Sequence, residues 1–161
     1  MASEPRPFLG LMAGIAAGLV ASAAMAAFQS QAHKLLPEEG GDEDPATVKA
    51  ADATAEAVTG DPVPDPHREQ AGTAVHYIVG GVLGGIYGVL AEYRPEARSG
   101  FGSAYGIATA ALLDEAAVPA AGLAPAPDES ALASHAYGAA SHLVYGWVLE
   151  GVRALIAGHR G

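Results

Sequence analysis

Five ionisable side chains lie in stretches of the sequence that are otherwise apolar, and their types could bind a metal ion or carry protons. They are His76, Asp114, Glu115, His135 and His142. Neutral imidazole and carboxylate suit zinc, iron or manganese, and two histidines from different helices could ligate a haem. The same groups could pass or sense protons, because imidazole titrates near neutral pH. A third interpretation is structural, in which hydrogen bonds from these side chains hold helices together.

A second set of charged residues ends two of the apolar stretches. Glu92 and Arg94 close one of them, and Glu150 and Arg153 lie near the end of the last. We interpret these four as ion pairs at the cytoplasmic surface of a membrane. The chain has no cysteine, which excludes disulfides and Cys-ligated zinc. Since the sequence also has no HExxH or Glu-x-x-His motif, we assign no catalytic residue.

Four apolar segments must position these groups, and they cover residues 8–28, 72–93, 100–119 and 131–157. Each is close to the ~20 residues that cross a bilayer as a helix. None alternates in the manner of a strand, and small residues recur at every fourth position, as in Gly80, Gly84 and Gly88. We therefore expect one all-α domain over residues 1–161, a four-helix transmembrane bundle packed through glycine stripes.

Short connections make successive spans antiparallel neighbours. This arrangement places His76, Asp114, Glu115 and His135 at similar depth in the bundle. His142 should lie deeper by ~10 Å, at 1.5 Å per helical residue. Depth therefore favours His135 as the partner of His76.

The stretch between the first two spans, residues 36–70, is rich in acids and prolines. We expect a long solvent-exposed acidic loop here, with a short helix near 46–58. The net charge of −10 argues against nucleic acid as a partner. Basic residues favour cytoplasmic termini (N-in/C-in) and an acidic loop outside. An alternative is that the first apolar segment, which ends in Ala-Met-Ala at 24–26, is a cleaved signal peptide.

Three blocks of the sequence carry a resemblance: AVHYIVGGVLGGIYGVLAEYRP (74–95), LLDEAAVPAAGLAP (112–125) and SHLVYGWVLEGVR (141–153). In order and motif, the chain resembles the YagU-like bacterial inner-membrane proteins. The resemblance implies an integral inner-membrane protein with polar residues inside its bundle, and no established catalytic mechanism. It points to His142, not His135, as the partner of His76. The positions that match the family pattern are His76, Glu92, Pro95, Pro119, Gly122, Leu123, His142 and Glu150.

These observations together predict a small inner-membrane protein without enzymatic activity. Its role would lie in envelope or acid homeostasis, or as an accessory subunit, and its partners would be the lipid bilayer and a second copy or a membrane complex. No cofactor is the first expectation. One alternative is a redox component that binds haem or a divalent metal at His76, Asp114, Glu115, His135 or His142. The other is a proton-coupled transporter that works as an oligomer.

Overall fold

The computed structural model describes residues 4–35 and 44–158, and every regular element in those residues is helical. The all-α prediction is thereby confirmed. The elements are α1 (Pro7–Leu35), α2 (Ala46–Thr59), η1 (Asp65–His67), α3 (Arg68–Tyr93), η2 (Pro95–Arg98), α4 (Ser103–Leu112), η3 (Leu113–Ala117), α5 (Val118–Ala120), η4 (Pro127–Glu129) and α6 (Leu132–Ala157).

Two of the differences between the predicted segments and the helices affect the geometry of the bundle. α1 continues to Leu35, well beyond the predicted end at residue 28, because no helix breaker follows Phe28 within the helix. The third segment begins at Ser103, and its helix changes from α to π geometry over Leu113–Ala117. A π turn inserts one extra residue into the helix and is found frequently at functional sites.

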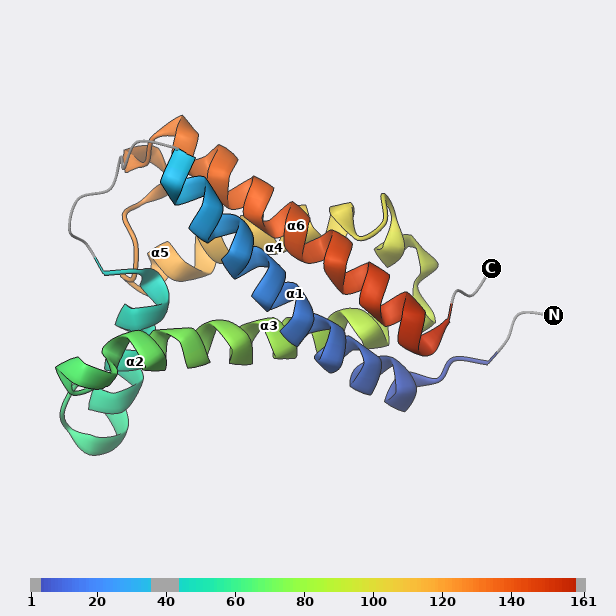
Figure 1. Cartoon of the computed structure of the whole chain (residues 1–161), viewed down its shortest axis with the longest axis horizontal. Helices are drawn as coiled ribbons and strands as arrows, with labels where there is room; N and C mark the ends of the chain where they lie inside the picture. Colours follow the sequence, from blue (N-terminus) through green and yellow to red (C-terminus); the bar gives the residue numbers. More distant parts are fainter. Residues whose placement is uncertain (1–3, 36–43, 159–161) are drawn as a thin grey trace.

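α1 and α3 run antiparallel and touch through glycine. Any side chain at Gly10 would lie 2.5 Å from the carbonyl oxygen of Gly88. At Gly84 a Cβ would lie 2.7 Å from the Cα of Gly18, closer than real side chains approach backbone. The two backbones are therefore in direct contact, as small residues at fourth positions permit. Figure 1 shows α1 lying across α3 at an angle.

α4 and α6 form a second antiparallel pair. Gly106 lies against the His142 carbonyl, where an added Cβ would meet the backbone of His142 and Leu143 across the interface. Gly102, at the start of α4, has a φ of +84° and also faces Gly146, so both its conformation and its surroundings require glycine. α1 lies against both α3 and α6. The buried core between the two pairs contains Ala17, Ala21, Met25, Tyr87, Tyr145 and Leu149.

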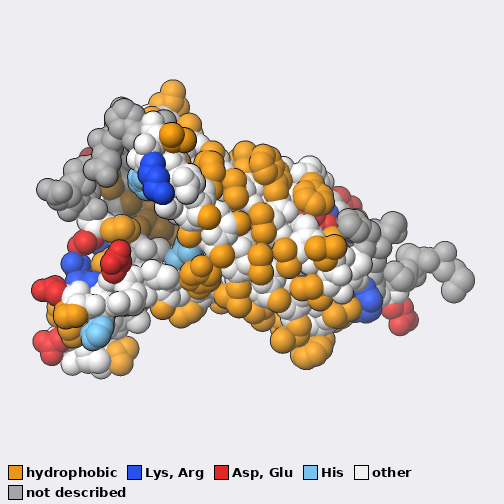
Figure 2. Space-filling view, in the orientation of Figure 1, with side chains coloured by type: hydrophobic (Ala, Val, Ile, Leu, Met, Phe, Trp, Pro, Cys, Tyr) orange, Lys and Arg blue, Asp and Glu red, His pale blue; other side chains and the backbone are white. Residues whose placement is uncertain are grey.

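The outside of the molecule carries many large apolar side chains. Ile78, Val82 and Ile86 are exposed on α3, Leu19 and Val20 on α1, and further ones on α4 and α6. Figure 2 shows hydrophobic side chains over the middle of the molecule and charged ones gathered toward its ends. Two helices in the described residues, Pro7–Leu35 and Asp65–Tyr93, are long and apolar enough to cross a membrane. Among the described residues, the other two predicted spans, 100–119 and 131–157, do not meet these criteria of length and apolar composition.

The interpretation of residues 36–70 as a solvent-exposed loop needs correction. Residues 36–43 lie outside the described part. The 14-residue helix α2 follows and occupies nearly the range expected for the short helix. Val48 and Ala51 of α2 are buried, with Val48 seated on Gly72 of α3, so one side of α2 packs on the bundle. In Figure 1, α2 lies at one end of the molecule, and both chain termini lie at the other.

Candidate functional site

A cavity of about 740 Å³ lies where α1, α3, α6 and the π turn η3 meet, beneath the first turn of α2. His76, Asp114 and His142 all line it, together with Ser22, Thr109 and Tyr145 and a larger number of apolar side chains. Its size is that of a small-molecule pocket. Figure 2 shows a recess at this end of the molecule, beside α2.

The π turn supplies the cavity with the carboxylate of Asp114. Asp114 Oδ2 lies 3.2 Å from Nδ1 of His142, whose side chain is 8% exposed, whereas the Asp114 side chain is 38% exposed. Nδ1 of His142 also lies 3.1 Å from the Gly138 carbonyl oxygen, and its proton can be donated to either acceptor. Gly138 leaves the space that the carboxylate occupies, because a Cβ there would lie 2.9 Å from Oδ2.

The next residue of the π turn makes a separate pair away from the cavity. Glu115 Oε1 lies 2.7 Å from Nδ1 of His135, and Nε2 of His135 lies 3.1 Å from the Pro127 carbonyl oxygen. Both ring nitrogens therefore face acceptors, and only a doubly protonated imidazolium donates to both. Neither Glu115 nor His135 lines the cavity. This pair ties α6 to the segment before it.

His76 shares the cavity with His142 and not with His135. Its Nε2 donates to the Ser22 carbonyl oxygen at 3.1 Å, which joins α3 to α1. The family resemblance had pointed to His142 and the depth argument to His135. The prediction from depth compared backbone levels alone, whereas the His142 ring extends back one turn to the Gly138 carbonyl oxygen, beside Asp114.

Four of the five predicted metal candidates form two pairs, and the fifth, His76, bonds to a backbone carbonyl oxygen. Within residues 4–35 and 44–158, no three histidine, aspartate or glutamate side chains lie together in a way that could hold a metal ion. Structural zinc sites have four ligands and catalytic ones three. The two His–carboxylate pairs supply two each.

The second predicted cluster is buried at the opposite end of the molecule. Glu150 and Arg153 are 3% and 2% exposed, and the guanidinium donates to both carboxylate oxygens, at 2.6 and 2.9 Å. The Tyr87 hydroxyl donates to Glu150 at 2.8 Å. Glu92 is also buried and accepts from the Arg6 backbone N–H at 2.7 Å. Arg94, which we expected in this cluster, is exposed instead.

Arg6 completes this end by joining three helices. Besides its contact with Glu92, its guanidinium donates to the Ala157 carbonyl oxygen at 2.6 Å, at the end of α6. Sequence reasoning missed Arg6 and Tyr87 as members of the cluster. Arg6 precedes the first helix, and the tyrosine side chain carries no charge. Tyr87 lies seven residues after Gly80 and therefore on the same face of α3. This spacing is the sequence pattern from which the burial of Tyr87 could have been predicted.

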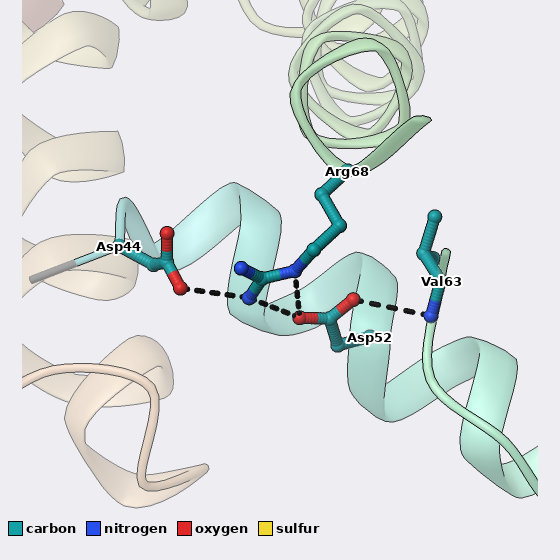
Figure 3. A network of polar contacts seen from close by, with 4 residues as sticks. All are labelled: Asp44, Asp52, Val63 and Arg68. Atoms are coloured by element: carbon teal, nitrogen blue, oxygen red, sulfur yellow. Dashed lines mark hydrogen bonds and ion pairs between the residues drawn. The ribbon is translucent and has the colours of Figure 1, made fainter. Parts of the chain in front are cut away.

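Sequence reasoning also missed the ion pairs that hold α2 in place. Arg68, at the start of α3, donates to Asp52 Oδ2 from Nε at 3.0 Å and from Nη2 at 2.6 Å, and to Asp44 at 2.7 Å. The other oxygen of Asp52 accepts from the Val63 N–H at 3.3 Å (Figure 3). The hydrogen bond from the Arg68 guanidinium holds the pKa of the Asp52 carboxyl below its usual range. These contacts fix the helix that lies over the cavity.

Comparison of the chain with protein-family models, curated proteins and solved structures gives no match.

Proposed function

We propose that the chain is a small multi-pass protein of the bacterial inner membrane, in which α1, α3, the α4–α5 segment and α6 all cross the bilayer. The apolar side chains exposed around the middle of the molecule support this, since a water-soluble monomer rarely leaves so large an apolar surface uncovered. Both termini and η2 lie at the same end, with Arg6, Arg94 and Arg98, which favours a cytoplasmic location for that end.

α1 belongs to the mature bundle in this proposal and is not removed as a signal peptide. Three observations support its retention: the glycine contacts with α3, the His76 hydrogen bond to Ser22, and the joining of Glu92 and Ala157 by Arg6. Cleavage after residue 26 would remove all three. The resemblance to the YagU-like proteins is part of the same proposal.

The membrane arrangement is tested on single-cysteine variants, because the natural chain has no cysteine. Exposed positions Glu56 in α2 and Ser99 after η2 are each replaced by cysteine in intact cells. We expect a membrane-impermeant maleimide to label Glu56→Cys from outside and Ser99→Cys only after permeabilisation. Labelling of both from the same side contradicts the four-span arrangement.

The function that the geometry supports best is non-enzymatic: a contribution to acid homeostasis through reversible protonation of the His142–Asp114 pair. The single observation that carries it is the location of this pair on the wall of a ligand-sized cavity. Ionisable groups inside membrane bundles are costly and are retained where they serve a function.

The protonation role is tested by NMR on the detergent-solubilised protein with ¹⁵N-labelled histidine. We expect the His142 resonances to titrate, and the midpoint to differ measurably in Asp114→Asn, because that variant removes the charge beside Nδ1. Glu115→Gln, in the same turn, should leave His142 unchanged. An unchanged His142 midpoint in Asp114→Asn refutes the coupling.

A second candidate is a proton-coupled transporter, favoured by the contact of the same pair with the cavity. Its test is pH-dependent proton flux in proteoliposomes. Flux that is absent in Asp114→Asn and present in Glu115→Gln would support transport, and equal flux in all three proteins would exclude it.

A further inference from the structure

The lining of the cavity has a distinct charge composition. Among the described residues that form it, the charged side chains are two acids, Asp114 and Glu69, and the lining has neither lysine nor arginine. Arg68 lies nearby in sequence but donates to Asp52 and Asp44. The remainder is mainly apolar and includes Met25, Val79 and Leu83. An anionic ligand would find no fixed positive charge here.

We propose that this cavity binds a lipophilic amine in its ammonium form, with the apolar body among the side chains of α1 and α3 and the ammonium beside Asp114. This proposal gives the chemical class of the ligand. It rests on the proposed function in one respect: both take the cavity as a functional site. A pocket of about 740 Å³ accommodates a drug-sized apolar body.

Asp114 is suited to receive an ammonium group because its charge is only partly compensated. Its contact with a charged partner in the described residues is the one with His142, through Oδ2. The side chain keeps 38% of its surface exposed, so it remains accessible from the cavity. An N–H donor near a carboxylate makes a charge-assisted hydrogen bond, which is stronger than a neutral one and strengthens in an apolar setting.

Ser22 is a further polar residue at the cavity wall. Its hydroxyl oxygen lies against Gly80, is buried, and has no hydrogen-bond partner among the described residues. A buried polar atom without a partner is uncommon and carries a cost unless a ligand or water satisfies it. An ammonium group has three N–H donors, enough for Asp114 and a neighbouring acceptor at once.

The protonation of His142 must oppose binding. The titratable groups that line the cavity beside Asp114 are His142 on α6 and His76 and Glu69 on α3, while Glu115 follows in the same turn and is paired with His135. α1 and α2 add no charged side chain to the lining. Protonated His142 places a positive charge 3.2 Å from the carboxylate that the ammonium needs. Proton and amine therefore compete for Asp114.

The test uses three probes with the same cage and different charge: 1-adamantylamine, 1-adamantanol and adamantane-1-carboxylate. Binding to the full chain in an uncharged detergent is measured by calorimetry at pH 7.5, with detergent alone as the blank. We expect the amine to bind at least about tenfold more tightly than the alcohol and the carboxylate, which corresponds to about 1.4 kcal/mol. The advantage of the amine should shrink as the pH falls toward 5.

Two isosteric variants complete the test. In Asp114→Asn the amine should bind no better than the alcohol, whereas Glu115→Gln, whose side chain does not line the cavity, should bind like the natural protein. Equal affinity for the three probes, or an amine preference that survives Asp114→Asn, overturns the proposal. The His142 titration is measured without ligand, so it can succeed while the amine fails. That combination refutes the ligand class and leaves the protonation role intact.

Discussion

The buried Glu150–Arg153 pair allows a quantitative prediction. Removing one partner, in Glu150→Leu or Arg153→Met, leaves the other charge 97–98% buried without its counter-charge. Such a loss costs about 3–5 kcal/mol of unfolding free energy in measured proteins. The double variant removes both charges and leaves the Tyr87 hydroxyl without its acceptor, a cost of about 1–3 kcal/mol. The double variant should therefore be more stable than either single variant.

The assay is reversible unfolding in mixed detergent micelles with increasing denaturing detergent, followed by circular dichroism. Arg94→Met is the matched control, because Arg94 is exposed at the same end and its removal should change stability by less than about 0.5 kcal/mol. If each single variant costs less than about 1 kcal/mol, or if the double variant costs the sum of the two, the burial argument is refuted.

Three further predictions concern the helix contacts. Gly84→Ala should destabilise by about 1–3 kcal/mol, because its Cβ would lie 2.7 Å from a backbone carbon of α1, whereas Gly81→Ala, whose nearest neighbour is a leucine side chain at 3.4 Å, should be neutral or slightly stabilising in the same unfolding assay. The lowered pKa of Asp52 means that its contribution is present above the pKa of the unfolded chain, near 4, and is lost as the pH falls through the lower folded value. A nitroxide label on α2 should therefore gain mobility only in strong acid, and in Arg68→Met it should be mobile at pH 7; a label mobile at pH 6 in the natural chain would contradict this. Tyr145→Phe removes a buried hydrogen bond of 2.6 Å to the Gly80 carbonyl and should cost about 0.6 kcal/mol of unfolding free energy. The same unfolding assay measures this cost, with a Tyr→Phe substitution outside the core as the control.

The helices themselves followed from the sequence. Apolar segments of helical length, separated by prolines and charged stretches, located α1, α3 and α6 to within a few residues at most ends, and α2 was expected almost where it lies. Glycine at fourth positions is a local pattern that can be read directly. The contacts between helices were harder to predict from the sequence, because α1 contacts both α3 and α6 and chain order alone does not show this.

The sequence identified the ionisable residues of the candidate site, but it did not predict which of them pair with one another. The sequence placed Asp114, Glu115, His135 and His142 in one cluster with His76, whereas the structure has two separate pairs, Asp114 with His142 and Glu115 with His135. The π turn shifts the helical register by one residue, and no residue type in Leu113–Ala117 (LDEAA) predicts it. The cavity depends on α2 covering it, and α2 is held by Arg68 through two aspartates that the sequence offered only as part of an acidic run.

The division of the bundle into two glycine-packed pairs has a consequence for how the chain is made. α1 and α3 can bring their glycine surfaces together as soon as α3 has left the ribosome, before α4 exists. α6 emerges last and must dock on α1, the earliest helix, so the contact of Arg6 with Ala157 joins the first and final turns of the bundle. We therefore expect the α1–α3 pair to form first during synthesis and the α4–α6 pair to pack against it afterwards. A chain severed between Arg98 and Gly102 should still assemble when its two halves are synthesised in the same cell.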